Sequence, residues 1–174
     1  MAGFKDEVER IAALNALGQS VAAEAQRAIE VPASSAVPQT MSLLRECASH
    51  LSGKKAPEKY ELPGSKLWSP KRSPEGYALY HRRSEKGGLL SLSILTPDGR
   101  FWAQQHTPLI GSKNHGDFIP ITVQALLGRK LTVGWEQSIG FDFDGTPTVV
   151  TKGTFGDSDS SLPLSRWLAE FVSK

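Results

Sequence analysis

The residues best suited to catalysis are two aspartates, Asp142 and Asp144, which stand one residue apart in the run 139–146. Paired carboxylates can hold Mg²⁺, and one of them can act as a nucleophile. Residues 141–145 read Phe-Asp-Phe-Asp-Gly. This alternation of phenylalanine and aspartate is also typical of a half-buried strand that enters an Asp-Gly turn. Asp157 and Asp159 add two carboxylates, but the four lack the spacing of a calcium-binding EF-hand loop. A metal-dependent enzyme using Asp142 and Asp144 is one alternative.

Locally, the run 139–146 resembles the nucleophile motif of haloacid-dehalogenase-type phosphatases. The resemblance implies that Asp142 attacks phosphorus, that Asp144 handles the proton of the leaving group, and that both help to hold Mg²⁺. That family also needs a parallel sheet and further Ser/Thr, Lys and acidic motifs downstream, whereas only 28 residues follow Thr146. Pro147 and the β-branched residues after it predict the return strand of a hairpin, so we favour a turn.

A second candidate metal site is the pair His115 and Asp117, which resembles the His-x-Asp pair of non-haem iron oxygenases. That resemblance implies a second histidine downstream, but His115 is the last histidine, so an unorthodox site would need His106. We favour a polar loop between strands.

The single cysteine, Cys47, excludes an intrachain disulfide and any zinc site that needs two cysteines of one chain. It lies on the apolar side of a predicted helix, where a small core residue is expected. No cofactor is expected.

Charge is unevenly distributed along the chain, although its formal net value is only +2. Residues 1–53 sum to −2, residues 54–130 to +7, and residues 131–174 to −3. A basic middle is typical of a surface that meets a polyanion, and it is also compatible with an ordinary solvated surface.

Cations and aromatic residues are interleaved in this basic middle. Aromatic faces can stack on bases while Lys and Arg pair with phosphates, as on sheets that bind single strands. The candidate nucleic-acid-binding residues are Lys66, Trp68, Lys71, Arg72, Tyr80, Arg82, Arg83 and Lys86. Strand alternation favours Tyr80 and Arg82 as surface residues over Tyr77. The alternative for the neighbouring aromatics Tyr77, Phe101 and Trp102 is core or cross-strand packing.

Apolar residues every three or four positions predict a long helix over 4–30. Two prolines and two serines in 31–38 predict a linker, and Thr40 is a candidate N-cap for a second helix over 40–52. The expected product is an antiparallel helical hairpin. Because the second helix covers only half of the first, we expect residues 4–30 either to form a homo-oligomer or to pack on the chain's own sheet.

From residue 77 onward, two-residue periodicity predicts an antiparallel sheet of about six strands, with tight turns at Thr-Pro-Asp-Gly in 96–99 and at Asp-Gly in 144–145. Its strands include 119–127 and 130–135, on either side of Gly128-Arg129. At most a short strand near Tyr60-Glu61-Leu62 is expected in the connection before the sheet. A C-terminal helix over about 162–172 is expected to pack on the sheet. The predicted fold class is α+β, with a helical hairpin in 1–53, a basic Pro/Gly-rich connection in 54–76, and the sheet with its helix in 77–174.

No complete catalytic set stands out, and no apolar run is long enough to span a membrane. The leading hypothesis is a non-enzymatic, oligomeric, cytoplasmic binding protein whose basic sheet surface meets a polyanion, most plausibly nucleic acid. The second is a protein–protein interaction module, such as an adaptor, inhibitor or immunity-type protein, that uses the N-terminal helix.

Overall fold

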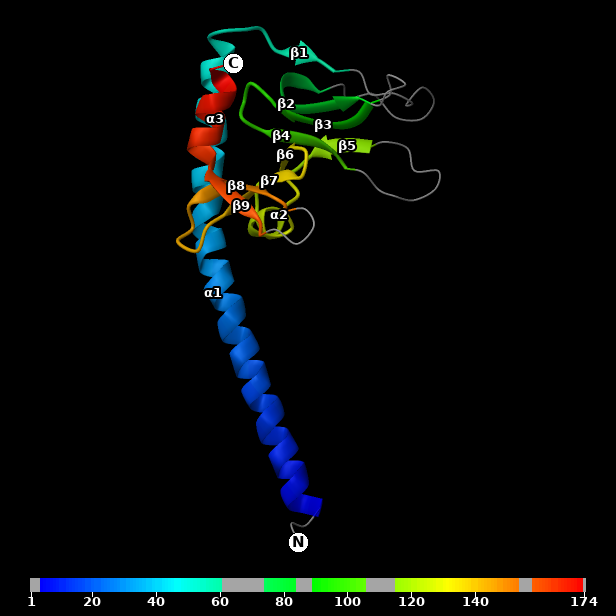
Figure 1. Cartoon of the computed structure of the whole chain (residues 1–174), viewed down its shortest axis with the longest axis vertical. Helices are drawn as coiled ribbons and strands as arrows, with labels where there is room; N and C mark the ends of the chain where they lie inside the picture. The colour runs from blue at the N-terminus through cyan, green and yellow to red at the C-terminus, as the bar shows by residue number, and fades with distance from the viewer. Residues whose placement is uncertain (1–3, 61–73, 84–88, 106–114, 154–157, 174) are drawn as a thin grey trace.

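The chain folds as an α+β protein, in agreement with the prediction. The structure, a computed structural model, describes residues 4–60, 74–83, 89–105, 115–153 and 158–173. Figure 1 shows a long helix that runs past a body of two antiparallel sheets. In chain order the elements are α1 (Phe4–Ser52), β1 (Glu58–Lys59), β2 (Glu75–Arg83), β3 (Leu89–Leu95), β4 (Phe101–Gln105), β5 (His115–Phe118), α2 (Val123–Leu127), β6 (Thr132–Gly134), β7 (Gln137–Phe141), β8 (Pro147–Thr151), β9 (Ser160–Pro163) and α3 (Leu164–Val172).

The predicted N-terminal hairpin is wrong, because residues 4–52 form one continuous helix that contains Pro32 and Pro38. A proline inside a helix removes one backbone hydrogen bond and costs about 3 kcal/mol. Packing compensates for that cost here, since the buried side of α1 continues through the proline segment. Ala33 and Ala36 are fully buried, while Pro38 lies on the exposed side.

Thr40 is not an N-cap, because it lies inside α1 on the same buried side. Its side chain is fully buried, and its hydroxyl has no hydrogen-bond partner in the part of the chain that the structure describes. The buried side then continues through Leu44, Cys47, Ala48 and Leu51 to the end of the helix. The C-terminal half of α1 is therefore a core helix of the body.

The first sheet has five strands in the order β1-β2-β3-β4-β5, with every neighbouring pair antiparallel. The hairpin between β3 and β4 turns at residues 96–100, where the Thr-Pro-Asp-Gly sequence predicted it. Gly99 has a φ of +79°, which favours glycine, and the Arg45 side chain of α1 lies directly against it. β1 ends one residue before Tyr60, and Glu61 and Leu62, where a short strand was also expected, lie outside the described residues.

The second sheet has four strands in the order β6-β7-β8-β9, so the expected single sheet of about six strands is instead two sheets with nine strands among the described residues. The Asp-Gly turn joins β7 to β8 as predicted, and Gly145 has a φ of +84°. The strand expected over 119–127 is wrong, because Val123–Leu127 forms the short helix α2. The Thr122 hydroxyl caps this helix by accepting a hydrogen bond from the backbone of Ala125 at 3.2 Å.

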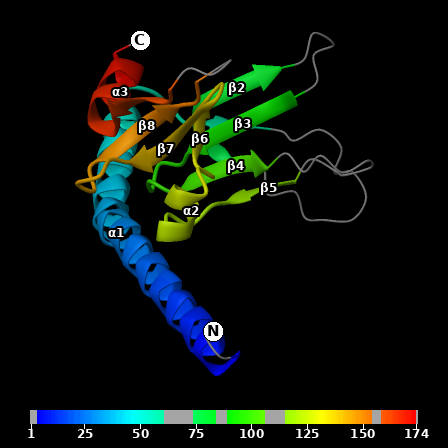
Figure 2. The ribbon, with the colours of Figure 1, turned by 60° about the horizontal axis from the view of Figure 1, so that its bottom comes forward.

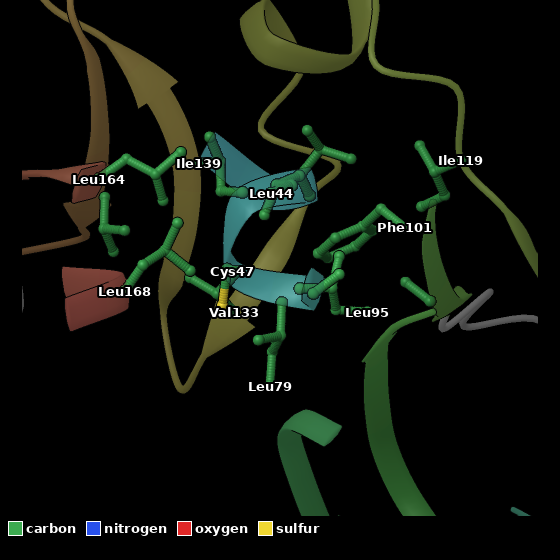
Figure 3. Packing of buried hydrophobic residues seen from close by; sticks show 14 of the residues in the cluster. Leu44, Cys47, Leu79, Leu95, Phe101, Ile119, Val133, Ile139, Leu164 and Leu168 are labelled. Carbon is green, nitrogen blue, oxygen red and sulfur yellow. The ribbon is translucent and has the colours of Figure 1, made fainter. Parts of the chain in front are cut away.

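The main core lies where α1, α3 and the two sheets meet (Figure 2). Figure 3 shows Leu44 and Cys47 of α1 between two sets of side chains, one from α3 and the second sheet and the other from the first sheet. A smaller cluster of Leu92, Ile94 and Trp102 is built from β3 and β4. The predicted C-terminal helix is confirmed as α3, which buries Leu164 and Leu168 against β8, β9 and α1.

Candidate functional site

The carboxylates of Asp142 and Asp144 serve the turn between β7 and β8. Asp142 Oδ1 accepts a hydrogen bond from the backbone N–H of Phe143 at 3.0 Å, and Asp144 Oδ1 accepts one from that of Thr146 at 2.9 Å. The latter bond lowers the pKa of Asp144 below its usual value. Because β7 and β8 form an antiparallel hairpin here, the parallel-sheet setting of a phosphatase nucleophile is not formed.

The other candidate carboxylates do not converge with this pair. Asp159 pairs with Arg129 at 2.7 Å, and this contact lowers the pKa of Asp159. Asp117 accepts a hydrogen bond from the backbone N–H of Phe118 at 2.8 Å. Asp157, His106 and the side chain of His115 lie outside the described residues. Within the described ranges, no group of three or more His, Cys, Asp or Glu residues is placed to hold a metal ion.

Cys47 is a core residue, as predicted, and burial raises the pKa of its thiol to about 11. A thiol with so high a pKa is almost entirely protonated near neutral pH, which makes it a poor nucleophile. Beside it lies a cleft of about 510 Å³ between α1 and α3, lined by apolar residues such as Leu43 and Val172 together with Glu46, His50 and Lys54.

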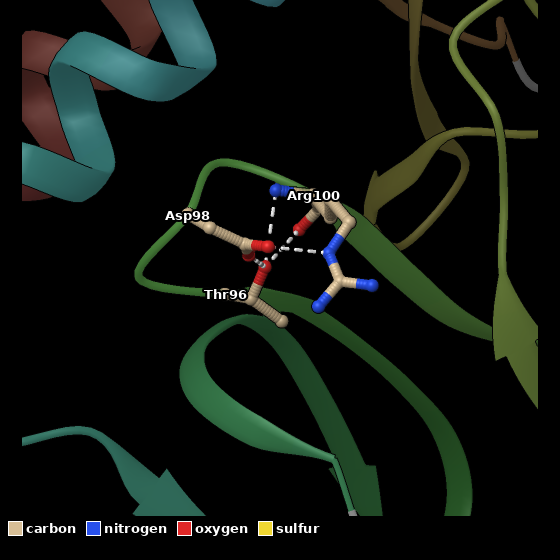
Figure 4. Close-up of polar contacts among 3 residues, drawn as sticks. All are labelled: Thr96, Asp98 and Arg100. Carbon is tan, nitrogen blue, oxygen red and sulfur yellow. Dashed lines mark hydrogen bonds and ion pairs between the residues drawn. The ribbon is translucent and has the colours of Figure 1, made fainter.

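A second cleft, of about 380 Å³, lies between α1 and the start of β4 and borders the turn at 96–100. Figure 4 shows the polar contacts of this turn, in which the Thr96 hydroxyl donates to Asp98 and accepts from the backbone N–H of Arg100 at 3.0 Å. The hydrogen bond from Thr96 is the main reason that the pKa of Asp98 is lowered. Arg100 also pairs with Asp98 at 2.5 Å and stacks over the ring of Phe118. These polar groups satisfy one another, so they act as turn-stabilising contacts.

Only two of the eight candidate nucleic-acid-binding side chains, Tyr80 and Arg82, belong to the described residues, and both are half-buried. Arg83 ends β2, and its side chain is outside the description. Lys66, Trp68, Lys71, Arg72 and Lys86 are outside it as well.

The predicted difference in exposure between Tyr77 and the pair Tyr80 and Arg82 is present, although Tyr80 and Arg82 are half-buried and not fully exposed. Tyr77, Phe101 and Trp102 are buried, which confirms the core alternative for these three. Arg82 stacks its guanidinium on the indole of Trp135, with its Cζ 3.7 Å from the ring centroid. Trp135 is 62 % exposed, and its pairing with Arg82 was not predicted because it follows β6 and is far from β2 in sequence.

A further exposed surface is the part of α1 that extends beyond the body (Figure 1). Every residue from 14 to 31, hereafter the projecting segment, is exposed. Five large apolar side chains lie on it: Leu14 at 60 %, Leu17 at 61 %, Val21 at 58 %, Ile29 at 46 % and Val31 at 72 % exposed. The sequence predicted the amphipathic pattern, and the structure shows that the chain's own sheets do not cover these side chains.

No protein-family model, curated protein or solved structure matches this chain. Among the described residues, none of the helices combines the length and the hydropathy needed to cross a membrane.

Proposed function

We propose that this protein is an interaction module in which the α+β body carries a helix that docks on another polypeptide. The observation that supports this function is the complete exposure of the projecting segment together with its large apolar side chains. Contiguous exposed apolar surface of this kind is typical of protein-interaction sites. The proposal includes a cytoplasmic location, because a chain with a single cysteine is compatible with a reducing compartment.

Helix physics supports a docked state. An isolated helix is marginally stable in water, and most helical stability in proteins comes from packing of an apolar face. The body anchors only the C-terminal half of α1, so the projecting segment lacks that packing within its own chain. Covering a side chain such as Leu17 with a partner helix contributes roughly 1–2 kcal/mol, since full burial is worth about 1.5–3 kcal/mol.

The test compares three full-length baits that differ only on the projecting segment. The first is the wild type, the second is Leu14→Gln/Val21→Gln, and the third is Ala16→Gln/Ala23→Gln. Both variants add two glutamines seven residues apart, but the third places them on the opposite side of α1. We expect a binding protein, the chain itself included, to bind the first and third baits and to be lost from the second. Equal binding to all three baits would refute the proposed function.

The pairing of Arg82 with Trp135 supports a second candidate, the binding of a polyanion such as nucleic acid. An exposed indole that carries a guanidinium offers both a stacking surface and a positive charge. Its test is fluorescence anisotropy with labelled single- and double-stranded DNA and RNA at two salt concentrations. We expect Arg82→Ala to weaken binding more than Arg166→Ala, which removes the same charge from α3. No binding at low salt, or equal losses in the two variants, would exclude this surface.

A further inference from the structure

The cleft between α1 and the start of β4 has the composition of a small-molecule site. Its volume of about 380 Å³ lies in the range of about 300–1,000 Å³ that is typical of ligand pockets. Most of its wall is apolar, and the apolar lining residues are Met41, Phe101, Phe118, Ile119, Pro120 and Ile121. Phe101 and Ile119 are buried, and Met41, Phe118 and Ile121 are half-buried. An apolar body placed against this wall would leave water on that side, which is favourable.

Two of the three charged side chains that line this cleft already have partners. Asp98 pairs with Arg100 (Figure 4), and the guanidinium of Arg100 also stacks on the ring of Phe118. Asp117 precedes Phe118 in β5 but is not part of the lining. The pair of Asp98 and Arg100 therefore neutralises itself and adds no net charge to the cleft.

Arg45 is the third charged side chain, and it lies one helical turn after Met41. Its guanidinium forms no hydrogen bond or ion pair within the part of the chain that the structure describes. The stem of Arg45 packs against the buried Gly99, so the charge is held at the edge of the cleft. The lining thus has two positive charges and one negative charge, which gives a net charge of +1.

Charge complementarity selects a monoanion as the ligand. A guanidinium forms paired hydrogen bonds with a carboxylate or with a phosphate. One carboxylate matches the net charge of the lining, whereas a phosphate monoester carries about −1.5 to −2 charges near pH 7 and would be repelled by Asp98. The phenylalanine rings and the thioether of Met41 favour contact with an aromatic body.

We infer that this cleft binds a small aromatic monocarboxylate, with the carboxylate on Arg45 and the ring against the apolar wall. The volume of the cleft is near the lower end of the range for ligand pockets, which suits a ligand of one or two rings. The inference goes beyond the proposed function, because it concerns the body and needs nothing from the projecting segment. A bound acid would join α1 to the first sheet, since Met41 and Arg45 come from α1 while Phe101 and Phe118 come from β4 and β5.

The experiment titrates the full-length chain, isotope-labelled in its methionine methyl groups, and follows the methyl signals by NMR. The probes are benzoate, phenylacetate, indole-3-acetate and 2-naphthoate, each compared with its own uncharged primary amide. The chain has two methionines, so Met41 reports the cleft while Met1 reports contacts elsewhere. We expect at least one acid to shift the Met41 signal saturably and to bind roughly 5- to 30-fold more tightly than its amide.

Arg45→Gln tests the charged contact, and Arg27→Gln is its matched control. Both arginines are exposed on α1 and lose the same charge, but Arg27 lies about 27 Å away at 1.5 Å per residue. We expect Arg45→Gln to weaken the binding of the acid roughly 5- to 30-fold and to leave the binding of the amide unchanged. Arg27→Gln should change neither affinity.

Three results would overturn the inference. The first is the absence of a saturable Met41 shift with all four acids up to about 10 mM, a range that detects dissociation constants of about 1 mM. The second is equal affinity for each acid and its amide, and the third is an equal loss of affinity in the two arginine variants. Each would show that Arg45 does not bind a carboxylate in this cleft. The three baits test the projecting segment separately, so the proposed function stands or fails independently of these results.

Discussion

Replacing Gly18 with alanine should have opposite effects on the helix and on the assembly. In one chain, the new methyl group meets nothing within 4 Å, so only the change in helix propensity operates. That change stabilises the projecting segment by about 1 kcal/mol, because glycine in a helix interior is less favourable than alanine by this amount. In the docked state of the proposed function, a partner helix that packs on the side of α1 that carries Leu14, Gly18 and Val21 meets the same methyl group.

The expected cost in the docked state follows from overpacking. Inserting a methyl group into a tight contact typically costs about 1–3 kcal/mol, which corresponds to a roughly 5- to 150-fold weaker complex. The helix content of the chain alone should therefore rise while the dissociation constant of the complex also rises. Circular dichroism at 222 nm measures the first quantity, and titration with a protein that the wild-type bait binds measures the second.

Ser20→Ala is the matched control, since its side chain is exposed and its hydroxyl only donates to the carbonyl of Leu17 at 2.8 Å. This change should raise helix content slightly and leave the affinity of the complex unchanged. The reasoning would be wrong if Gly18→Ala strengthened the complex along with the helix, because Gly18 would then lie outside the contact.

Two further predictions concern the sheet and the core. Gly116→Ala should lower the urea midpoint by an amount equivalent to about 2 kcal/mol or more, since its Cβ would lie 1.9 Å from Trp102 Cζ2 in a buried contact; an unchanged midpoint would contradict the packing. The pKa of the Cys47 thiol is about 11 in the folded chain against an ordinary value of 9.0, so folding keeps the thiol protonated. The free energy of unfolding should therefore fall as the pH rises from about 9 to about 11. Urea titrations should show that Cys47→Ala removes this pH dependence.

Local sequence signals predicted those parts of the fold that depend on a few neighbouring residues. The turns at Gly99 and Gly145 were predictable because each needs a positive φ that glycine adopts without strain. The apolar spacing in the C-terminal helix also gave α3 and its buried side, with Leu164 and Leu168. In both cases the physical requirement is met within a short stretch of chain.

Elements decided by distant packing were not predictable in this way. Pro32 and Pro38 indicate a helix end by their own chemistry, and only the contacts of the buried side of α1 with the body keep the helix continuous. The apolar run 123–127 fits a strand or a helix equally well by pattern, and the Thr122 cap decides for the helix. The pairing of Arg82 with Trp135 depends on how the two sheets meet, which no local pattern encodes.

The position of Pro32 has a mechanical consequence for the projecting helix. Proline has no N–H to donate to the carbonyl four residues earlier, so the ladder of backbone hydrogen bonds is interrupted where α1 leaves the body. A helix bends most easily at such an interruption, so α1 is expected to bend at Pro32, next to the body, and to move the far end of the projecting segment. A tilt of about 10° at this point moves the tip of the roughly 42 Å arm by about 7 Å. The orientation of the body relative to a protein docked on the projecting segment would therefore be set at this proline.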